Sequence, residues 1–394
     1  MDEQKAGGER KPTGDVGVAL VLPREDDIPS TELASSAPTP SPVVEVALPP
    51  GLSPGSTQER ILIVIPCLNE AAFIGSVIAD LLRDAAAQDG LIVVADGGST
   101  DGTRDIVAKI AAADPRVKLL PNPQKFQAPG VNHAVRAFAD GFTWLARIDA
   151  HAHYPPNYVA DLVAEARKTG ATSVVVSLDA HGDNPFQRAT AAAQNSRLGA
   201  GGSPHRRKDA HGWVDHGHHA LFRTDAFRAI GGYDEGFTHN EDAEFDRRLT
   251  DYGGRIWLTD QVSVVYHPRS EPGALWRQYV NYGSGRARTI LKHRMSLKIR
   301  QMLPAAVAPA VLAAPFSVLF WPAGLPALLW AAASMAYGAI LGLKARDPAV
   351  LLCGAVAMEM HLAWSIGFWR EVLFGRRRGA APTPHGTTPV RPAE

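Results

Sequence analysis

Apolar positions along the chain alternate between short unbroken runs and longer stretches with a helical period. Residues 61–65 (ILIVI) and 91–95 (LIVVA) are unbroken apolar runs, which are typical of parallel strands covered on both faces. Between them, residues 71–83 place apolar side chains at helical spacing. This pattern predicts a strand–helix–strand unit with a right-handed crossover. It also predicts helices over residues 104–113 and 131–139, and strands over residues 117–120 and 144–148.

The same pattern divides the chain into regions. Residues 1–58 are rich in Pro, Ser, Gly and Glu, and they carry too little apolar surface to fold, so a disordered tail is expected. Residues 59–270 read as a globular α/β domain, because apolar runs and helical patterns alternate there. A basic interfacial segment (271–301), membrane helices (302–374) and a second disordered tail (375–394) complete the predicted organisation.

The membrane prediction rests on two long apolar stretches. Residues 302–343 are 42 residues without one charge, far more than the ~20 needed to span a bilayer. Pro322 and Gly324 split this stretch into a hairpin that returns Lys344 to the cytoplasm. Residues 348–369 form a third apolar stretch, which either crosses the membrane or lies in its interface and spares Glu359 a midplane position. Length favours three crossings, in a bacterial inner membrane with the α/β domain on the cytoplasmic side.

Charge adds two constraints. Lys+Arg 40 balances Asp+Glu 40, so nothing in the bulk charge indicates nucleic acid as a partner. The basic run is local: residues 272–303 hold seven Lys or Arg and no Asp or Glu, as expected for a segment that faces membrane lipid. Cys67 and Cys353 lie in very different surroundings, and no disulfide is expected between them.

Polar side chains follow the predicted strands at the points where the strands end. Asn69 and Glu70 follow the first strand, Asp96 the second, and Asp149 the strand before DAHAH. In an open parallel sheet these ends line one crevice, where such sheets bind ligands. The segment ADGGSTDGT (95–103) carries neither phosphate-loop motif, and a tight turn explains its glycines but not Asp96. Three carboxylates at one sheet edge therefore predict a site.

Four motifs together resemble the inverting, GT-A fold glycosyltransferases of family 2: IVIPCLNEAAFIG, VVADGGSTDGT, RIDAHA and HNEDAEFDRRL. Within that family, the chain is most similar to the succinoglycan-biosynthesis subgroup, whose members also carry Asp-Ala-His-Ala and a membrane C-terminus. The resemblance spans about residues 60–374. It implies a mostly parallel GT-A sheet with flanking helices, followed by α-helical membrane segments.

The resemblance also implies roles for individual residues. Pro66, Asn69 and Glu70 match the first-strand loop that holds the uridine and ribose of the donor. Asp96 matches the aspartate that bonds uracil, and Asp149 matches the first acid of the Asp-x-Asp motif. Asp242, beside Glu241, matches the catalytic base. The alternative for this acidic pair is an ordinary amphipathic helix start, where acids suit the helix dipole. Arg277 and Arg286 are candidate diphosphate or acceptor contacts, or simply part of a basic interfacial helix.

A divalent metal, Mn²⁺ or Mg²⁺, is the expected cofactor, held through Asp149. His151 stands where the family pattern has a second aspartate. Imidazole binds Mn²⁺, although it suits Mg²⁺ less well than a carboxylate does. His151 is therefore either a metal ligand or a hydrogen-bond donor to a phosphate. A histidine-rich stretch, residues 210–235 with His205 upstream, lacks closed zinc spacing, and the resemblance assigns it to the acceptor side.

The resemblance implies transfer of a sugar from a nucleotide-diphosphate sugar, with UDP-hexose expected, to a lipid-linked saccharide acceptor at the cytoplasmic membrane face. Attack from the face opposite the leaving group gives a β-linkage, and the pathway implied is exopolysaccharide biosynthesis. Two alternatives remain open. One is a polyprenyl-phosphate glycosyltransferase, and the other is a non-catalytic membrane scaffold with this fold. The intact set of Asp96, Asp149 and Asp242 speaks against the scaffold.

Overall fold

The computed structural model describes residues 59–203 and 210–375, apart from the side chains of Ala200 and His219. The predicted tails, except for Gly375, lie outside the described residues, and so does His205.

An eight-stranded mixed sheet forms the centre of the described catalytic domain, in the order β3-β2-β1-β4-β7-β5-β8-β6. The strands β1 to β4 pair in parallel, β7 is antiparallel to both β4 and β5, and β8 is parallel to β5. The bounds are β1 Ile61–Cys67, β2 Leu91–Asp96, β3 Val117–Pro121, β4 Trp144–Arg147, β5 Ser173–Ala180, β6 Gly212–Val214, β7 His218–Arg223 and β8 Ile256–Tyr266. All four predicted strands are present, and the predicted GT-A-type α/β architecture is confirmed.

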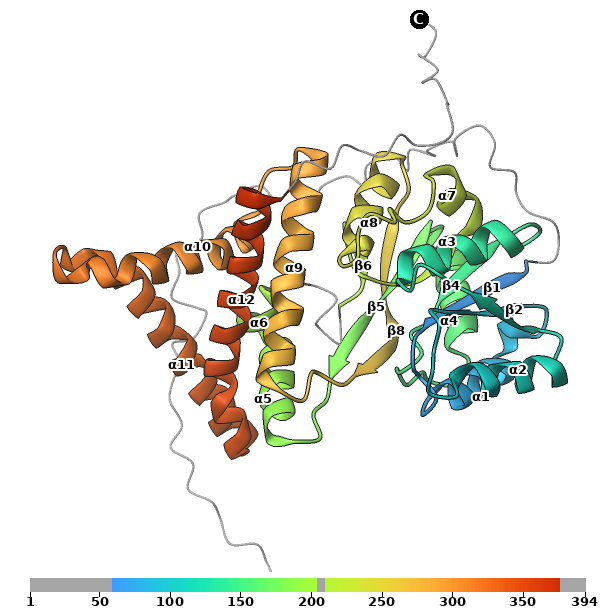
Figure 1. The fold of residues 1–394 in the computed structure, drawn as a ribbon, viewed down its shortest axis with the longest axis horizontal. Coiled ribbons are helices and arrows are strands. Elements are labelled where there is room, and N and C mark those ends of the chain that lie inside the picture. The colour runs from blue at the N-terminus through green and yellow to red at the C-terminus, as the bar shows by residue number, and fades with distance from the viewer. Residues whose placement is uncertain (1–58, 204–209, 376–394) are drawn as a thin grey trace, which may run out of the picture. The chain divides into compact units, whose positions relative to one another are not determined.

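Helices cover both faces of the sheet (Figure 1). Residues of β1 alternate between two cores, with Ile61, Ile63 and Ile65 on one side and Leu62 and Val64 on the other. The first core packs against α1, α2 and α4, and the second against α3, α7 and α8. The bounds are α1 Ile74–Arg83, α2 Thr103–Ala113, α3 Gln127–Phe138, α4 Tyr158–Thr169, α5 Pro185–Gln194, α6 Arg197–Ala200, α7 Thr224–Ala229 and α8 Glu241–Asp251, with a short 3₁₀ turn, η2, at Ala85–Ala87.

Two predicted helix starts were wrong by a turn. The helix expected from residue 71 begins at Ile74, because the amides of Phe73 and Ile74 first close a turn on the carbonyl of Glu70. The helix expected from residue 131 begins at Gln127 and contains Pro129 in its first turn, where a missing amide costs little.

Four long helices follow the sheet domain. They are α9 Pro272–His293, α10 Ile299–Ala313, α11 Leu325–Ala345 and α12 Cys353–Phe374, with 3₁₀ turns η4 Ala314–Val318, η5 Trp321–Gly324 and η6 Pro348–Leu352. The break between α10 and α11 lies where the prolines predicted it. By length and apolar composition, three stretches of the described chain are candidate membrane spans: Ile299–Val318, Trp321–Ala345 and Pro348–Phe374.

Helix α12 packs along α9, and the two lie side by side in Figure 1. The crossing is close: a β-carbon added to Gly283 would overlap the carbonyl of Trp364, and one added to Gly367 would overlap the carbonyl of Val280. The hydroxyl of Ser284 donates to the Gly367 carbonyl at 3.0 Å. Helix α12 also contacts α5 and α6 of the sheet domain. It is therefore built into the folded enzyme. Both cysteines are free and buried, as expected.

Candidate active site

The loops that follow β1 and β2 are tied together by hydrogen bonds. The amide of Asn69 donates to Ser99 Oγ at 2.8 Å, and Asn69 Oδ1 accepts from the Thr100 amide at 2.9 Å. The amide of Glu70 donates to Thr103 Oγ1 at 2.8 Å. Asn69 has a φ of 59°, a left-handed conformation that asparagine tolerates better than most residues. These hydrogen bonds hold Asn69 and Glu70, two of the residues predicted for nucleotide binding, against the loop that follows β2.

Asp96 is the last residue of β2 and is buried beside these two loops. It is only 3% exposed, and its carboxylate accepts from the amides of Gly98 at 3.0 Å and Ser99 at 3.2 Å. Arg104 Nε lies 3.6 Å from Asp96 Oδ2. In this arrangement Asp96 shapes the loop, and its contact with a uracil base stays a prediction. Pro66 pairs with Ala95 in the β1–β2 register, one position before Asp96.

A buried arginine, Arg147, joins the remaining predicted acids. It occupies the last position of β4 and donates through Nη1 to Asp242 Oδ1 at 2.6 Å. Its guanidinium nitrogens also lie 3.4 Å from Asp149 Oδ1 and 3.6 Å from Glu241 Oε1. The structure therefore brings the metal-motif aspartate and the proposed base together around one cation. Sequence reasoning named the acids but missed Arg147, although it is the first letter of the RIDAHA motif.

The acids at the start of α8 sit where the helix geometry favours them. Asn240 caps the helix in a left-handed conformation with a φ of 65°, and Glu241 and Asp242 follow in the first turn. Unpaired amides at a helix start carry partial positive charge, which stabilises carboxylates there. The helix ends at Asp251, and Gly253 follows with a φ of 92°, a conformation that glycine adopts readily.

Burial and neighbouring charges shift the pKa values of Glu241 and Asp149 in opposite directions. Burial, with the neighbouring charge of Asp242, raises the pKa of Glu241 to about 7, and the charge of Arg147 only partly offsets this rise. Burial also acts to raise the pKa of Asp149, but Arg147 and His218 outweigh it and hold that pKa well below its usual range. Burial acts to lower the pKa of Arg147, but its acidic neighbours raise that pKa well above the ordinary value. Arg147 and Asp149 are therefore charged, while Glu241 titrates near neutrality.

The metal-motif aspartate has a histidine neighbour that the sequence analysis did not name. His218 Nε2, at the start of β7, lies 3.5 Å from Asp149 Oδ2, whereas His151 Nδ1 lies 2.9 Å from Glu70 Oε1. No group of three His, Cys, Asp or Glu side chains in the described part of the chain is arranged to hold a metal by itself. Adjacent ligands of an octahedral ion with bonds of about 2.1 Å lie about 3 Å apart. Asp149 and His218 therefore fit two positions of such an ion, with the others left for a diphosphate and water.

These groups open into one large cavity of about 1650 Å³. Its polar part is lined by Asp149, Glu241 and Asp242 and by the histidines His151 and His218. It is also lined by side chains of α9, α10, α11 and α12, among them the predicted Arg277 and Arg286. The cavity therefore connects the sheet edge to the apolar helices.

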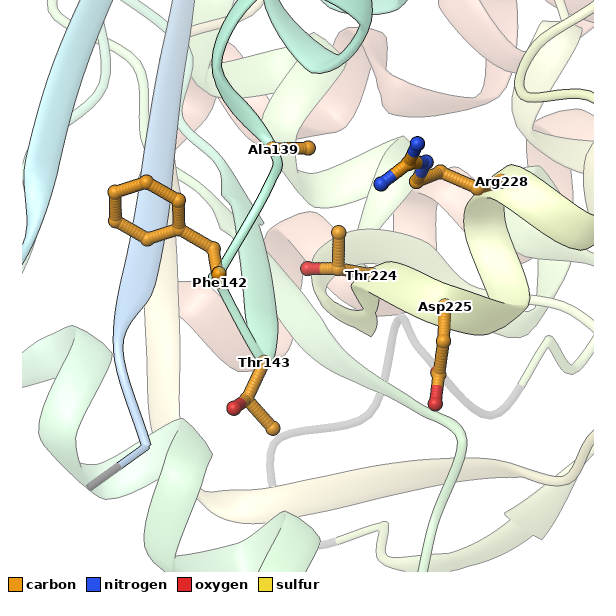
Figure 2. Close-up of a pocket in the computed structure, with 7 residues that line it drawn as sticks. Ala139, Phe142, Thr143, Thr224, Asp225 and Arg228 are labelled. Carbon is orange, nitrogen blue, oxygen red and sulfur yellow. The ribbon is translucent and has the colours of Figure 1, made fainter. Parts of the chain in front are cut away.

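A second pocket of about 230 Å³ lies at the opposite end of β4 (Figure 2). It is lined by Phe142 and Thr143, which precede that strand, and by Thr224, Asp225 and Arg228 of α7. Open sheets of this type bind ligands at the carboxyl ends of their parallel strands, and this pocket is at the amino end of β4. It contains none of the predicted site residues.

A mixed sheet of this order, with acids at the carboxyl ends of β1, β2 and β4 and at the start of α8, defines a GT-A-type glycosyltransferase. The Glycosyl transferase family 2 model matches residues 62–231. The chain is also 51% identical over 324 residues to succinoglycan biosynthesis protein ExoA of Rhizobium meliloti (strain 1021), a match that covers 82% of this chain and 98% of that protein. The chain belongs to glycosyltransferase family 2, and the predicted resemblance is confirmed.

A solved structure supports the fold. The mannosyltransferase PcManGT from Pyrobaculum calidifontis, determined in complex with GDP-Man and Mn²⁺, is 18% identical and aligns with a TM-score of 0.52 over 82% of this chain and 90% of its own.

Proposed function

We propose that this enzyme transfers a hexose from a nucleotide-diphosphate sugar, UDP-hexose in the first instance, to a hydroxyl of a lipid-linked saccharide, with inversion to a β-linkage. The observation that carries this proposal is the pairing of Asp242 with Arg147 at 2.6 Å, in the same cavity as Asp149. A base and a donor-binding acid then face one space, and a buried cation holds both in place.

The chemistry assigns a role to each group. Asp242 accepts the proton of the acceptor hydroxyl as that oxygen attacks the anomeric carbon, and the nucleoside diphosphate departs from the opposite face. Asp242 pairs with Arg147 at 2.6 Å, and a neighbouring cation favours the carboxylate form that a base requires. Glu241 lies 3.6 Å from Arg147 Nη1, and its pKa is raised to about 7, so its neutral form limits the negative charge that Arg147 must balance.

A divalent ion, Mn²⁺ or Mg²⁺, fits the donor side of the site. Asp149 and His218 would hold it together with the diphosphate. His151 is a further candidate, either as a metal ligand or as a hydrogen-bond donor to a phosphate. When bound, such an ion neutralises the charge that develops on the leaving diphosphate. The relative that was solved with GDP-Man and Mn²⁺ supports this assignment. Pro66, Asn69, Glu70 and Asp96 are the proposed nucleoside-binding residues.

The relative ExoA supports a pathway and a location. Its name places that protein in succinoglycan biosynthesis, and we extend exopolysaccharide synthesis to this chain on the basis of 51% identity. Three candidate membrane helices support attachment to the bacterial inner membrane, with membrane lipid as a partner and the catalytic domain in the cytoplasm.

The test is transfer by purified full-length protein in detergent. Radiolabelled UDP-glucose and UDP-galactose are supplied with Mn²⁺ and a membrane extract that contains lipid-linked saccharides. We expect label in a lipid product, and we expect Asp242→Asn to lower transfer ~10²- to 10⁴-fold with little change in UDP affinity. Asp251→Asn, at the exposed end of the same helix, is the matched control.

The product distinguishes the alternatives. Extension of a lipid-linked saccharide leaves the new sugar on another sugar, in a linkage that survives mild acid. Label released by mild acid as the free monosaccharide would indicate transfer to a lipid phosphate instead. Asp242→Asn with wild-type rates would remove the proposed base, and no transfer from any nucleotide sugar would leave the scaffold alternative.

A further inference from the structure

Arg286 and Arg300 are among the arginines of the large cavity that make no ion pair with a described residue. Arg286 on α9 and Arg300 in the first turn of α10 both line this cavity, and neither side chain makes an ion pair or hydrogen bond with any other described residue. Each of the neighbouring basic residues Arg288 and Lys292 has a carboxylate within 3.0 Å. A guanidinium left without a partner in a cavity wall is costly, and a bound anion would compensate it.

The two charges are close enough to oppose each other. Burial and the positive charge of Arg300 lower the pKa of Arg286 to about 10. The acid that acts in the other direction is Asp246, and its carboxylate is already bonded to His216 Nδ1 at 2.7 Å and to the Gly217 amide at 3.3 Å. Because both side chains also line the same cavity, a ligand with more than one negative charge would compensate both.

Arg286 belongs to a turn of α9 that contacts the start of α8, and Arg300 belongs to α10, which contributes apolar wall residues. Gly285, the residue before Arg286, approaches Asn240 so closely that an added β-carbon would lie 2.6 Å from Asn240 Cβ. This contact fixes that turn of α9 against the start of α8. Helices α10 and α11 contribute apolar wall residues, which include Leu303, Val307, Ala310, Trp330 and Ala333. Anion, sugar and hydrocarbon would thus occupy successive parts of one cavity.

We infer that Arg286 and Arg300 form a subsite for the diphosphate of a polyprenyl-diphosphate-linked acceptor, whose hydrocarbon chain lies along α10 and α11. The inference rests on the proposed function and specifies its acceptor. The saccharide attached to the diphosphate would then extend toward Asp242. Arginine suits this role because its planar fork bonds two phosphate oxygens at once.

Binding of geranylgeranyl diphosphate to full-length protein in detergent tests the subsite without requiring transfer. We expect Arg286→Gln and Arg300→Gln each to weaken binding about 10- to 100-fold, as for the loss of a charge-assisted hydrogen bond. Arg286→Lys should retain part of the affinity. Geranylgeraniol, which lacks the anion, should bind wild type and variants equally. Arg294→Gln, in the same basic run but outside the cavity lining, is the matched control.

Three comparisons separate the subsite from other anion sites. The affinity for UDP with Mn²⁺ should be unchanged in both glutamine variants, because a parallel loss would assign the arginines to the donor diphosphate and overturn the inference. Displacement of the probe by excess phosphatidylglycerol would overturn it as well, since the site would then be a phospholipid surface. Equal binding of geranylgeranyl diphosphate by wild type and both variants is the third contrary result. A protein that binds the probe through these arginines but transfers no sugar would keep the subsite and lose the proposed function.

Discussion

Gly285 on α9 lies against Asn240, the cap of α8, so closely that a β-carbon on the glycine would be 2.6 Å from Asn240 Cβ and 2.8 Å from the carbonyl oxygen of His239. Both neighbours belong to the segment that presents Glu241 and Asp242 to the cavity. Helix α9, which packs against the candidate membrane helix α12, therefore also positions the proposed base.

Gly285→Ala should move the start of α8 and lower transfer at least tenfold, while UDP binding at the other side of the cavity stays near the wild-type value. The new methyl group would overlap Asn240 Cβ and the backbone carbonyl of His239, and neither of these can move aside as the end of a flexible side chain could. Gly273→Ala is the matched control in the same helix, because its nearest atom is Arg277 Nη1 at 3.8 Å. Steady-state transfer and UDP titration measure the effect. Wild-type transfer by Gly285→Ala would show that the approach of α9 does not hold the base.

Replacement of Arg147 by methionine should both destabilise the protein and abolish transfer. The change leaves three carboxylates, on the buried Glu241 and the partly buried Asp149 and Asp242, without their shared cation. Removal of one partner from a buried ion pair typically costs ~3–5 kcal/mol. Arg136→Met, which removes an exposed ion pair with Glu235, should change stability by less than ~1 kcal/mol. Thermal unfolding in detergent is the measurement, and equal melting temperatures for the two variants would contradict this account.

Glu241→Gln should remove a pH dependence of stability. The folded-state pKa of Glu241 is raised from 4.5 to about 7, so between these values the folded protein holds a proton that the unfolded chain releases. The resulting stabilisation is complete below pH 4.5 and is lost as the pH rises through about 7. Wild type should therefore lose stability across this window relative to Glu241→Gln. Melting temperatures of both proteins with EDTA, at several pH values in this window, measure the difference; parallel curves would contradict the prediction.

The sheet and its acids were predictable because the information is local. Unbroken apolar runs mark buried strands, and a polar residue directly after such a run must lie at the sheet edge. Asn69, Asp96 and Asp149 were placed in this way. The helix starts at Ile74 and Gln127 were missed by about a turn, because periodicity reports the buried face of a helix and not its first hydrogen bond.

Contacts between distant segments were not predictable from the same patterns. His218 reaches Asp149 because β7 enters the sheet antiparallel, between β4 and β5, an order that apolar runs do not encode. Arg147 reads as an ordinary polar residue at the end of a strand until α8 brings Asp242 to it. The role of Gly283 in α9 and Gly367 in α12 likewise becomes clear only in the folded protein, where each allows the two helix backbones to approach closely. One feature of the sequence could have pointed to Arg147: it is the first residue of the RIDAHA motif, two positions before Asp149.

Metal removal should distinguish the two candidate histidines. EDTA and Asp149→Ala should each remove most of the transfer activity. His218→Ala should weaken activation by Mn²⁺ more than His151→Ala does, because His218 lies 3.5 Å from Asp149 whereas His151 is bonded to Glu70. Loss of an imidazole ligand should also narrow the preference for Mn²⁺ over Mg²⁺. Activation curves for both ions, with melting temperatures as the folding control, provide the measurement. A larger effect of His151→Ala would restore the ligand that the motif predicted.

The packing of α12 changes the membrane topology that length alone favours. Half of the most apolar part of Pro348–Phe374 is buried within the protein, against 17% and 11% for the other two candidate spans. His361 Nε2 also lies 2.8 Å from the carbonyl oxygen of Leu198, at α6 of the sheet domain. A helix that contacts α5, α6 and α9 remains with the catalytic domain. By contrast, the turn between α10 and α11 lies farthest from the sheet in Figure 1, and its Val318 and Leu319 are about 90% exposed.

We therefore expect two crossings, made by α10 and α11, with α12 in the cytoplasmic interface beside α9. In this arrangement Glu359 avoids the bilayer centre, and the basic residues after Phe374 stay on the cytoplasmic side, as the positive-inside tendency requires. Alkaline phosphatase and green fluorescent protein fused after Glu394, and inserted after Phe320, measure the topology. The fusion after Glu394 should fluoresce without phosphatase activity, and the insertion after Phe320 should show the reverse. Phosphatase activity at the C-terminus would mean that α12 crosses as well, and the three-crossing arrangement would then hold.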